Sequence, residues 1–401
     1  MDIQNHNQLN CAGESNAIFS SSYNFNKLFF TILYSLFLVL SLTSFIWDID
    51  TLIKVNAFIG VFVFILLNIR IKKEYIPIYA YIGILIASFL VSSFFVDRTG
   101  WRFFTPIIFI LSSIGPAMIL LKRYVYSWGG YVVFYSLTGY FLMLMLSGVD
   151  GNSALRFCSF NGISIVMLIA CISLYIILNM EGKRIDLKPA VITFIILIWG
   201  IGRSGIISSF ILLLGLLFIR FRAKKKYIYI MIICLSALLI LAYLRWETLL
   251  LFFRDNSFLK NAIDHYFRRG GGWDSVRTTI WMNYFNNLDI FRVMFGVNVV
   301  TDPWPAGELN EYNYHNSFIN LHSQTGFMGL VTLGIMIFAA FKFYNTNKAF
   351  FILLLVLILR SSTDLLIFFG RFDFIPFFFI FYFLKNRSVK EPATGNRLNL
   401  N

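Results

Sequence analysis

Apolar runs of about 20 residues recur along most of the chain and are separated by short polar connections. A helix needs about 20 apolar residues to cross a hydrocarbon core, so each long run predicts a membrane span. Counting in this way gives about twelve spans. They are 28–46, 55–69, 76–95, 103–121, 125–146, 160–179, 190–202, 206–219, 227–244, 327–341, 349–359 and a last run that ends near Leu384. The pattern therefore predicts an all-α polytopic membrane protein.

One interval interrupts the apolar pattern. Residues 245–325 are polar and aromatic, and they hold four of the eight Trp and three of the four His. The predicted organisation has five parts: a cytosolic tail (1–26), nine spans (27–244), a large and partly helical outer loop (245–325), three spans (326–384) and a second tail (385–401). Since the remainder is typical of a membrane scaffold, we expect any chemistry in or beside this loop.

Composition and charge agree with this class. Hydrophobic residues make up 58% of the chain and charged residues only 13%, while the net charge is +14. The basic residues cluster between apolar runs, and one set of alternate connections holds 20 of the 34 Lys and Arg. Cytosolic connections are rich in Lys and Arg, so this set predicts that both termini are cytosolic and the large loop lies outside. The charge thus indicates topology and no nucleic-acid partner.

Several site types are not indicated by the sequence. The four Cys lie far apart and form no Cys-x-x-Cys or Cys/His spacing, so neither a disulfide framework nor a zinc site is predicted. A phosphate-binding P-loop and a His-Glu-x-x-His zinc helix are also missing. We therefore predict neither a metal nor a cofactor.

Arg203 carries the charge with the highest free-energy cost for its predicted position in the membrane. It lies between Gly202 and Gly205, where two apolar runs that are each too short to cross alone meet. An arginine at a helix break inside a membrane is stabilised by pairing or by an aqueous cavity, which makes it a functional candidate. The alternative is that Arg203 extends to the outer interface as an anchor.

Arg277 lies in a segment predicted to be helical from Trp273 to Leu288, with Asp274 as a possible cap. Trp281 follows one turn later, on the same face. A guanidinium group can bind phosphate oxygens through two parallel hydrogen bonds, which lysine cannot reproduce. The alternative is a surface arginine stacked on Trp281.

His315 directly precedes the apolar run that begins near Gly326, and His322 follows seven residues later. On a helix the two rings would lie on nearly one face. An imidazole can accept a proton from a sugar hydroxyl near neutral pH, so His315 is a candidate general base. We interpret His322 as structural.

Charged residues also stand near the outer ends of the last two spans: Arg360, Asp364, Arg371 and Asp373. They could line the same cavity as Arg203, or they could form salt bridges that allow two short helices to lie in lipid. We favour the structural interpretation. Further candidates for lining the cavity are Trp281, Asn316 and His322.

Five motifs occur in a characteristic order: Gly202-Arg203-Ser204-Gly205, Trp273-x-x-x-Arg277-x-x-x-Trp281, Phe295-Gly296-Val297-Asn298, His315-Asn316-Ser317-Phe318-Ile319 and Gly326-x-x-Gly329-Leu330. Their order and rough spacing, together with the predicted spans and long outer loop, resemble the O-antigen polymerase and O-antigen ligase superfamily. The resemblance covers residues 199–329 by motif and the rest of the chain only by hydropathy.

The resemblance implies a membrane glycosyltransferase of the C-type (GT-C-like) fold class in the bacterial inner membrane, with its active site on the periplasmic face. It also implies an undecaprenyl-diphosphate-linked oligosaccharide as donor, with no nucleotide sugar and no metal. In the family, arginines that match Arg203 and Arg277 are associated with the donor diphosphate, and the histidine that matches His315 with activation of the acceptor hydroxyl. Membrane lipids are expected partners, and a chain-length regulator protein is left open.

Two alternatives stay open at this point. A ligase would transfer the glycan to a lipid A core sugar; the form of the His315 motif and the Phe-rich outer loop favour the polymerase. A lipid-linked glycan flippase or other transporter would instead call for paired halves, charges at the membrane midplane and short loops. The loop of about 80 residues argues for the enzyme.

Overall fold

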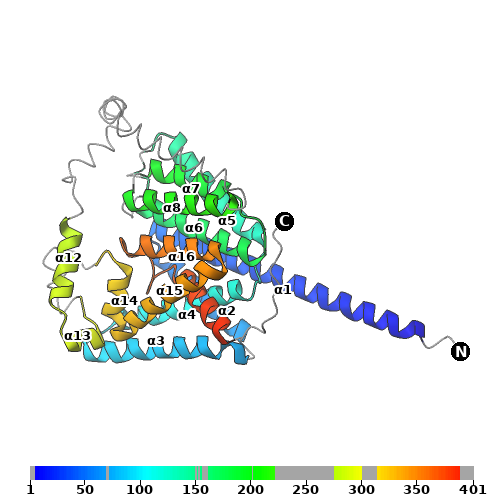
Figure 1. Cartoon of the computed structure of the whole chain (residues 1–401), viewed down its shortest axis with the longest axis horizontal. Helices are drawn as coiled ribbons and strands as arrows, with labels where there is room; N and C mark the ends of the chain where they lie inside the picture. The colour runs from blue at the N-terminus through cyan, green and yellow to red at the C-terminus, as the bar shows by residue number, and fades with distance from the viewer. Residues whose placement is uncertain are drawn as a thin grey trace.

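The computed structural model describes residues 5–68, 72–149, 151, 154–155, 161–200, 202–221, 275–299 and 314–388. Every regular element in these ranges is a helix (Figure 1). The helices are α1 (Asn5–Trp47), α2 (Asp50–Asn68), η1 (Lys73–Tyr75), α3 (Ile76–Phe95), α4 (Trp101–Leu121), α5 (Ser127–Leu146), α6 (Asn161–Met180), α7 (Lys188–Trp199), α8 (Arg203–Phe221), α12 (Ser275–Asn286), α13 (Ile290–Phe295), α14 (Ser317–Thr325), α15 (Phe327–Thr346), α16 (Lys348–Ser361) and α17 (Phe374–Ser388). The predicted span 227–244 and the loop residues 245–274 lie outside the described residues.

Within the described residues, eight helices are long and apolar enough to cross a membrane: α1 from Asn24 onward, α2, α3 with η1, α4, α5, α6, α8 and α15. This agrees with the predicted all-α class and fits a protein that crosses a membrane several times. α7, α16 and α17 coincide with further predicted spans, but they have only 12, 14 and 15 residues. α16 and α17 are short because Arg360, Asp364, Arg371 and Asp373 interrupt the last apolar runs.

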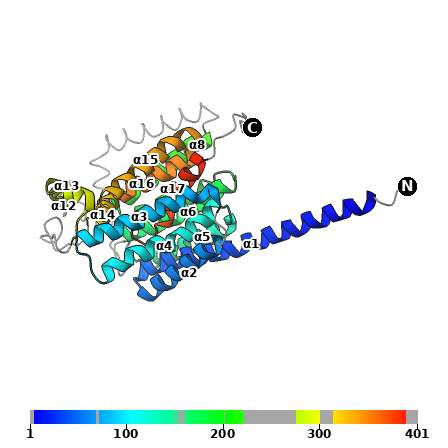
Figure 2. The same ribbon diagram turned by 90° about the horizontal axis from the view of Figure 1, so that it is seen from below.

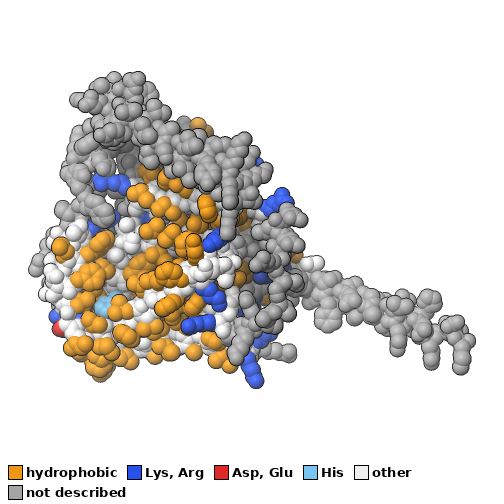
Figure 3. Space-filling model, viewed as in Figure 1, with side chains coloured by type: hydrophobic (Ala, Val, Ile, Leu, Met, Phe, Trp, Pro, Cys, Tyr) orange, Lys and Arg blue, Asp and Glu red, His pale blue; other side chains and the backbone are white. Residues whose placement is uncertain are grey.

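The surface of the molecule also fits a protein that crosses a membrane several times. In Figure 3, apolar side chains cover much of the described surface in view, and most of the visible Lys and Arg side chains gather toward the right-hand side. α1 leaves the bundle on that side and continues to Asn5, so most of the stretch predicted as a polar tail prolongs this helix (Figure 1).

α6 is the central helix of the bundle. Every one of its residues except Asn179 is buried. It contacts α1, α4, α5, α7, α8 and α16, and Figure 1 shows it between the α5, α7 and α8 group and the α15 and α16 pair. A helix that is apolar on all sides is buried in this way because it has no polar face to present.

The helix break predicted at Arg203 is present. α7 ends at Trp199, α8 begins at Arg203, and the two helices pack against each other. Gly205 lies against α6, where an added Cβ would be 2.2 Å from the Cβ of Ser164. Glycine therefore allows the first turn of α8 to approach α6 closely, which places Arg203 beside the beginning of α6.

At the opposite end of the bundle, Glu181 joins three helices. Its carboxylate lies 2.9 Å from Lys27 Nζ of α1 and 3.0 Å from Lys183 Nζ. It also accepts a hydrogen bond of 3.0 Å from the backbone N of Ser127, at the start of α5. Burial by itself raises the pKa of Glu181, but the bonds from Lys27, Lys183 and Ser127 outweigh it and hold the pKa below its ordinary value of 4.5.

Glu181→Gln should remove a pH-dependent part of the stability. Because the folded-state pKa lies below the unfolded one, the stabilisation is fully present above about pH 4.5 and is lost as pH falls through the folded-state value. At pH 7 the substitution should cost roughly 1.5–3 kcal/mol, the range for hydrogen bonds to charged groups. Thermal unfolding of both proteins in detergent should show their Tm values converging on acidification. Parallel pH profiles would contradict this role of Glu181.

Candidate functional site

Three helices from the predicted outer loop and its border lie against one end of the bundle. α12, α13 and α14 group together, away from the side where α1 leaves (Figures 1 and 2), and α13 and α14 contact α3. A small apolar cluster holds this group together, made of Ile280, Tyr284, Val297, Tyr314 and Ile319. This second core positions the polar side chains of the three helices.

Arg277 and Trp281 lie one turn apart on α12 and bond to two different segments. Arg277 Nη1 donates to the carbonyl oxygen of Thr363 at 2.7 Å. Trp281 Nε1 donates to the carbonyl oxygen of Tyr314 at 2.8 Å. The spacing that predicted a common helix face thus brings Arg277 to the turn after α16, residues 362–364, and Trp281 to the residue before His315.

His322 is buried, and both of its ring nitrogens have protein partners. Nδ1 lies 2.6 Å from the hydroxyl of Tyr284, and Nε2 lies 3.1 Å from the carbonyl oxygen of Val293. Burial lowers the pKa of His322, and the Val293 carbonyl offsets part of that effect. A carbonyl only accepts, so Nε2 carries the proton of the neutral ring and Nδ1 accepts from Tyr284. His322 therefore joins α12 and α13 to α14.

His315 does not share a helix face with His322, because α14 begins only at Ser317. Asn316 caps this helix: its Oδ1 accepts from Phe318 N at 2.9 Å and Ile319 N at 3.1 Å. His315 precedes the cap with φ of 48°, in the left-handed region. The cap thus makes α14 begin after His315, so that only His322 lies on this helix.

The 362–364 turn is the point where several candidates meet. Asn316 Nδ2 donates to the carbonyl oxygen of Ser362 at 2.9 Å. Ser317 Oγ donates to the carbonyl oxygen of Asp364 at 2.9 Å. Together with Arg277, these bonds connect α12 and the start of α14 to one turn. The amide of Asn316 is engaged on both sides, so this residue positions its neighbours.

Arg360 lies beneath this turn and is 1% exposed. Its Nη2 lies 3.3 Å from Asp364 Oδ2 and donates to Ser164 Oγ at 3.0 Å. A third contact of 3.4 Å reaches the carbonyl oxygen of Asn161. Arg360 and Asp364 therefore connect the turn to the beginning of α6, next to the close contact between Gly205 and Ser164.

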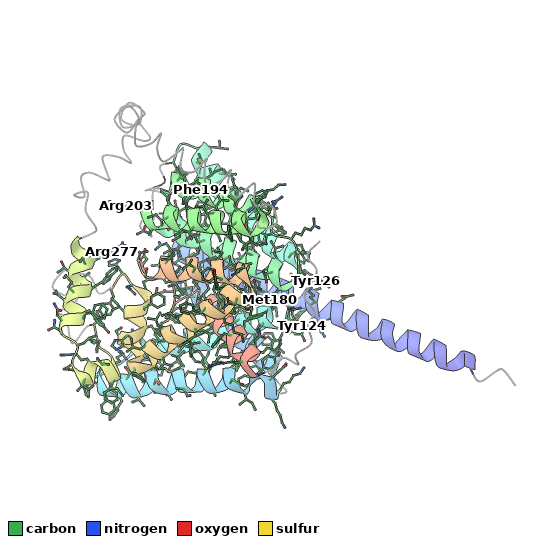
Figure 4. The ribbon with its side chains drawn as sticks, viewed as in Figure 1. Tyr124, Tyr126, Met180, Phe194, Arg203 and Arg277 are labelled. Carbon is green, nitrogen blue, oxygen red and sulfur yellow. The ribbon has the colours of Figure 1, made fainter. Side chains whose placement is uncertain are left out.

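Arg203 belongs to the same end of the molecule. It is exposed, is the first residue of α8, and stands two residues before Gly205. Figure 4 shows Arg203 and Arg277 on one side of the bundle, and Tyr124 and Met180 on the other. Arg277 thus bonds directly to the 362–364 turn, and His315 precedes Asn316, which also bonds to it. Arg203 begins the helix whose Gly205 packs against Ser164, a hydrogen-bond partner of Arg360.

Arg371 and Asp373 have different surroundings. Arg371 Nη2 lies 2.9 Å from Asp48 Oδ1, and its Nη1 donates to the carbonyl oxygen of Ser44 at 2.5 Å. The buried carboxylate of Asp373 accepts from the backbone N of Gly370 at 3.1 Å. Arg371 thus holds the segment between α16 and α17 against the end of α1. This ion pair corresponds to the structural interpretation given above, in which these charges form salt bridges.

Two of the glycine motifs meet in space. Gly296 has φ of 83° and Gly326 has φ of 57°. An added Cβ would lie 2.2 Å from the carbonyl oxygen of Ser323 at Gly296 and 2.0 Å from that of Met294 at Gly326. Val297 N also donates to the Ser323 carbonyl at 2.9 Å. Both positions therefore require glycine, because the backbone has a positive φ and because a neighbouring carbonyl oxygen leaves no room for a Cβ.

Arg98 is a positioning residue that no sequence motif indicates. It is 7% exposed and follows α3. Its Nη1 donates to Ser92 Oγ and to the carbonyl oxygen of Gln324, both at 3.0 Å. Its Nη2 donates to the carbonyl oxygens of Val297, at 3.1 Å, and Ser323. Burial lowers its pKa to about 10, so Arg98 keeps its charge at pH 7.

No protein-family model matches this chain, and no curated protein matches it either. The family resemblance therefore rests on the motifs quoted above. Among the residues that the structure describes, no group of three or more His, Cys, Asp or Glu is placed to hold a metal ion.

Proposed function

We propose that this protein is an O-antigen polymerase. It would join undecaprenyl-diphosphate-linked oligosaccharide repeat units on the periplasmic face of a bacterial inner membrane, within a GT-C-like architecture of about twelve spans. One observation carries the proposal: Arg203, Arg277 and His315, far apart in sequence, lie on segments assembled at one end of the bundle around the 362–364 turn.

The two arginines suit the charge that the reaction develops. Cleavage of the bond between an anomeric carbon and a lipid diphosphate places negative charge on the leaving diphosphate and positive charge on the sugar ring. Guanidinium groups already in position stabilise the leaving group without reorganisation. The bond to Thr363 orients Arg277 before substrate arrives. Arg203 stands in the first turn of α8, where the helix dipole also favours an anion.

His315 has the role of general base in this proposal. It accepts the proton of the acceptor hydroxyl while the hydroxyl oxygen forms a bond to the anomeric carbon. The bond to the diphosphate breaks on the opposite side, undecaprenyl diphosphate leaves with the electron pair, and the anomeric centre is inverted. The Asn316 cap and its bond to Ser362 hold the backbone beside His315.

A strain that lacks the protein tests the proposal. If the protein is the polymerase, its lipopolysaccharide should carry single repeat units on the lipid A core, because ligation continues while chain growth stops. Long O-glycan ladders in that strain would reject the proposal. A core without any O-glycan would assign the ligase activity instead. Purified protein supplied with synthetic lipid-linked repeats should lengthen the glycan; translocation without lengthening would assign a transporter.

A further inference from the structure

A cavity of about 580 Å³ opens at the end of the bundle opposite to the candidate site. It lies where α2, α4, α6 and α17 end, beside η1, and Figure 4 shows two of its lining residues, Tyr124 and Met180, far from Arg203 and Arg277. Four cationic side chains line it: Lys72, Lys122, Arg123 and Lys385. The proposed glycosyl transfer makes no use of this cavity.

The positive charges of the cavity are crowded. Lys122 Nζ and Lys385 Nζ each lie 5.1 Å from the centre of the Tyr75 ring. Glu74 forms a long ion pair of 4.0 Å with Lys385 and does not line the cavity. Burial, and after it the nearby Lys72 ammonium, lowers the pKa of Lys122 to about 8. An anion among these groups would relieve their mutual repulsion.

The cavity also has an apolar wall. Its apolar lining includes Leu66, Leu67, Leu121 and Met180. On α2, Phe62 and Ile65 are 41% and 57% exposed, just before the lining residues. Exposed apolar side chains on a membrane-spanning helix face lipid, so the cavity adjoins the surface that acyl chains cover. A ligand with a charged head and apolar tails fits this combination.

We infer that this cavity binds the phosphate head group of an anionic phospholipid, with its acyl chains lying along α2. Basic pockets between membrane helices are typical sites for such head groups. Arg123 can bind two phosphate oxygens at once, while the lysine ammonium groups act as point charges. A soluble phosphate ion would use the same cations but gain nothing from the apolar wall.

The test compares lipid binding by two double variants of the full-length protein. Arg123→Gln with Lys385→Gln removes two charges from the cavity. Lys188→Gln with Arg220→Gln removes two exposed charges from the same end outside it. Lys122 is left unchanged because its Nζ also donates to the carbonyl oxygen of Leu67 at 2.7 Å.

Native mass spectrometry in detergent measures binding of phosphatidylglycerol and phosphatidylcholine with identical acyl chains. We expect the unsubstituted protein and the Lys188/Arg220 variant to retain phosphatidylglycerol selectively. The Arg123/Lys385 variant should bind it roughly 30-fold more weakly, from about 1 kcal/mol for each basic residue.

Three outcomes would overturn the inference. The first is equal binding of the two lipids by the unsubstituted protein, and the second is equal retention of phosphatidylglycerol by the two double variants. The third is that inorganic phosphate, at matched ionic strength, raises Tm as much as phosphatidylglycerol does, which would identify the ligand as a soluble anion. Thermal unfolding of each variant without lipid checks that the substitutions leave the fold intact.

Discussion

Replacing His315 with Asn is expected to stop glycan polymerisation while the protein stays folded. The proposed role of the imidazole is to remove the proton of the acceptor hydroxyl, and loss of a general base typically costs 10²–10⁴-fold in rate. Asn is among the residues that best tolerate a positive φ, and His315 has φ of 48°. His315→Asn therefore removes the base and keeps the backbone conformation. Glycan length on gels and chain growth by purified protein measure the effect.

A second variant separates chemistry from folding. His315→Ala also lacks the base, but alanine tolerates the left-handed conformation less well, so this variant should be equally inactive and slightly less stable. Cells with normal levels of the His315→Asn protein and unchanged long ladders would show that His315 is not the base. Equal activity of both variants near the unsubstituted rate would lead to the same conclusion.

Arg98→Met should be the most destabilising single substitution considered for the site region. The carbonyl oxygens of Val297 and Gln324 would each lose the hydrogen bond from Arg98. An unsatisfied buried polar group costs about 1–3 kcal/mol, so the total loss should be roughly 3 kcal/mol or more. These bonds hold the segments on both sides of the Gly296 and Gly326 contact, so activity should fall together with stability. Thermal unfolding in detergent measures the loss.

Arg292→Met is the matched control for Arg98→Met. Arg292 pairs with Asp289 at 3.2 Å, and both side chains are partly exposed. An ion pair of this kind contributes at most about 1 kcal/mol, so the control should unfold close to the unsubstituted protein. Arg98→Lys should be intermediate, because lysine keeps the charge without the planar fork of donors. A Tm for Arg98→Met no lower than that of the control would contradict the role assigned to Arg98.

Part of the candidate site was visible as local pattern. The glycines around Arg203 predicted a helix break, and α7 and α8 are separated there. The spacing of Arg277 and Trp281 predicted a shared helix face, and both bond from α12 toward neighbouring segments. Such features can be predicted from the sequence because they depend only on residues within one or two helical turns.

Other parts depended on contacts between distant segments. Nothing near Arg98 in the sequence indicates that it bonds to carbonyl oxygens 199 and 226 residues away. Asp364 was a candidate because of its charge, but the backbone carbonyl groups of the 362–364 turn were not, because they carry no signature in the sequence. Asn316 was expected to line a cavity, yet its side chain caps α14 and bonds to this turn.

The sequence by itself determined that the chain forms helices long enough to span a membrane. The reason is that the length of an apolar segment decides whether it can cross a hydrocarbon core. It also determined where helices break, because glycine and capping residues act locally. Only the tertiary structure decided that Arg277, Asn316 and Arg360 meet at one turn and that Lys122 and Lys385 approach one ring. Those encounters follow from how whole helices pack around α6, and that packing is a property of the assembled bundle.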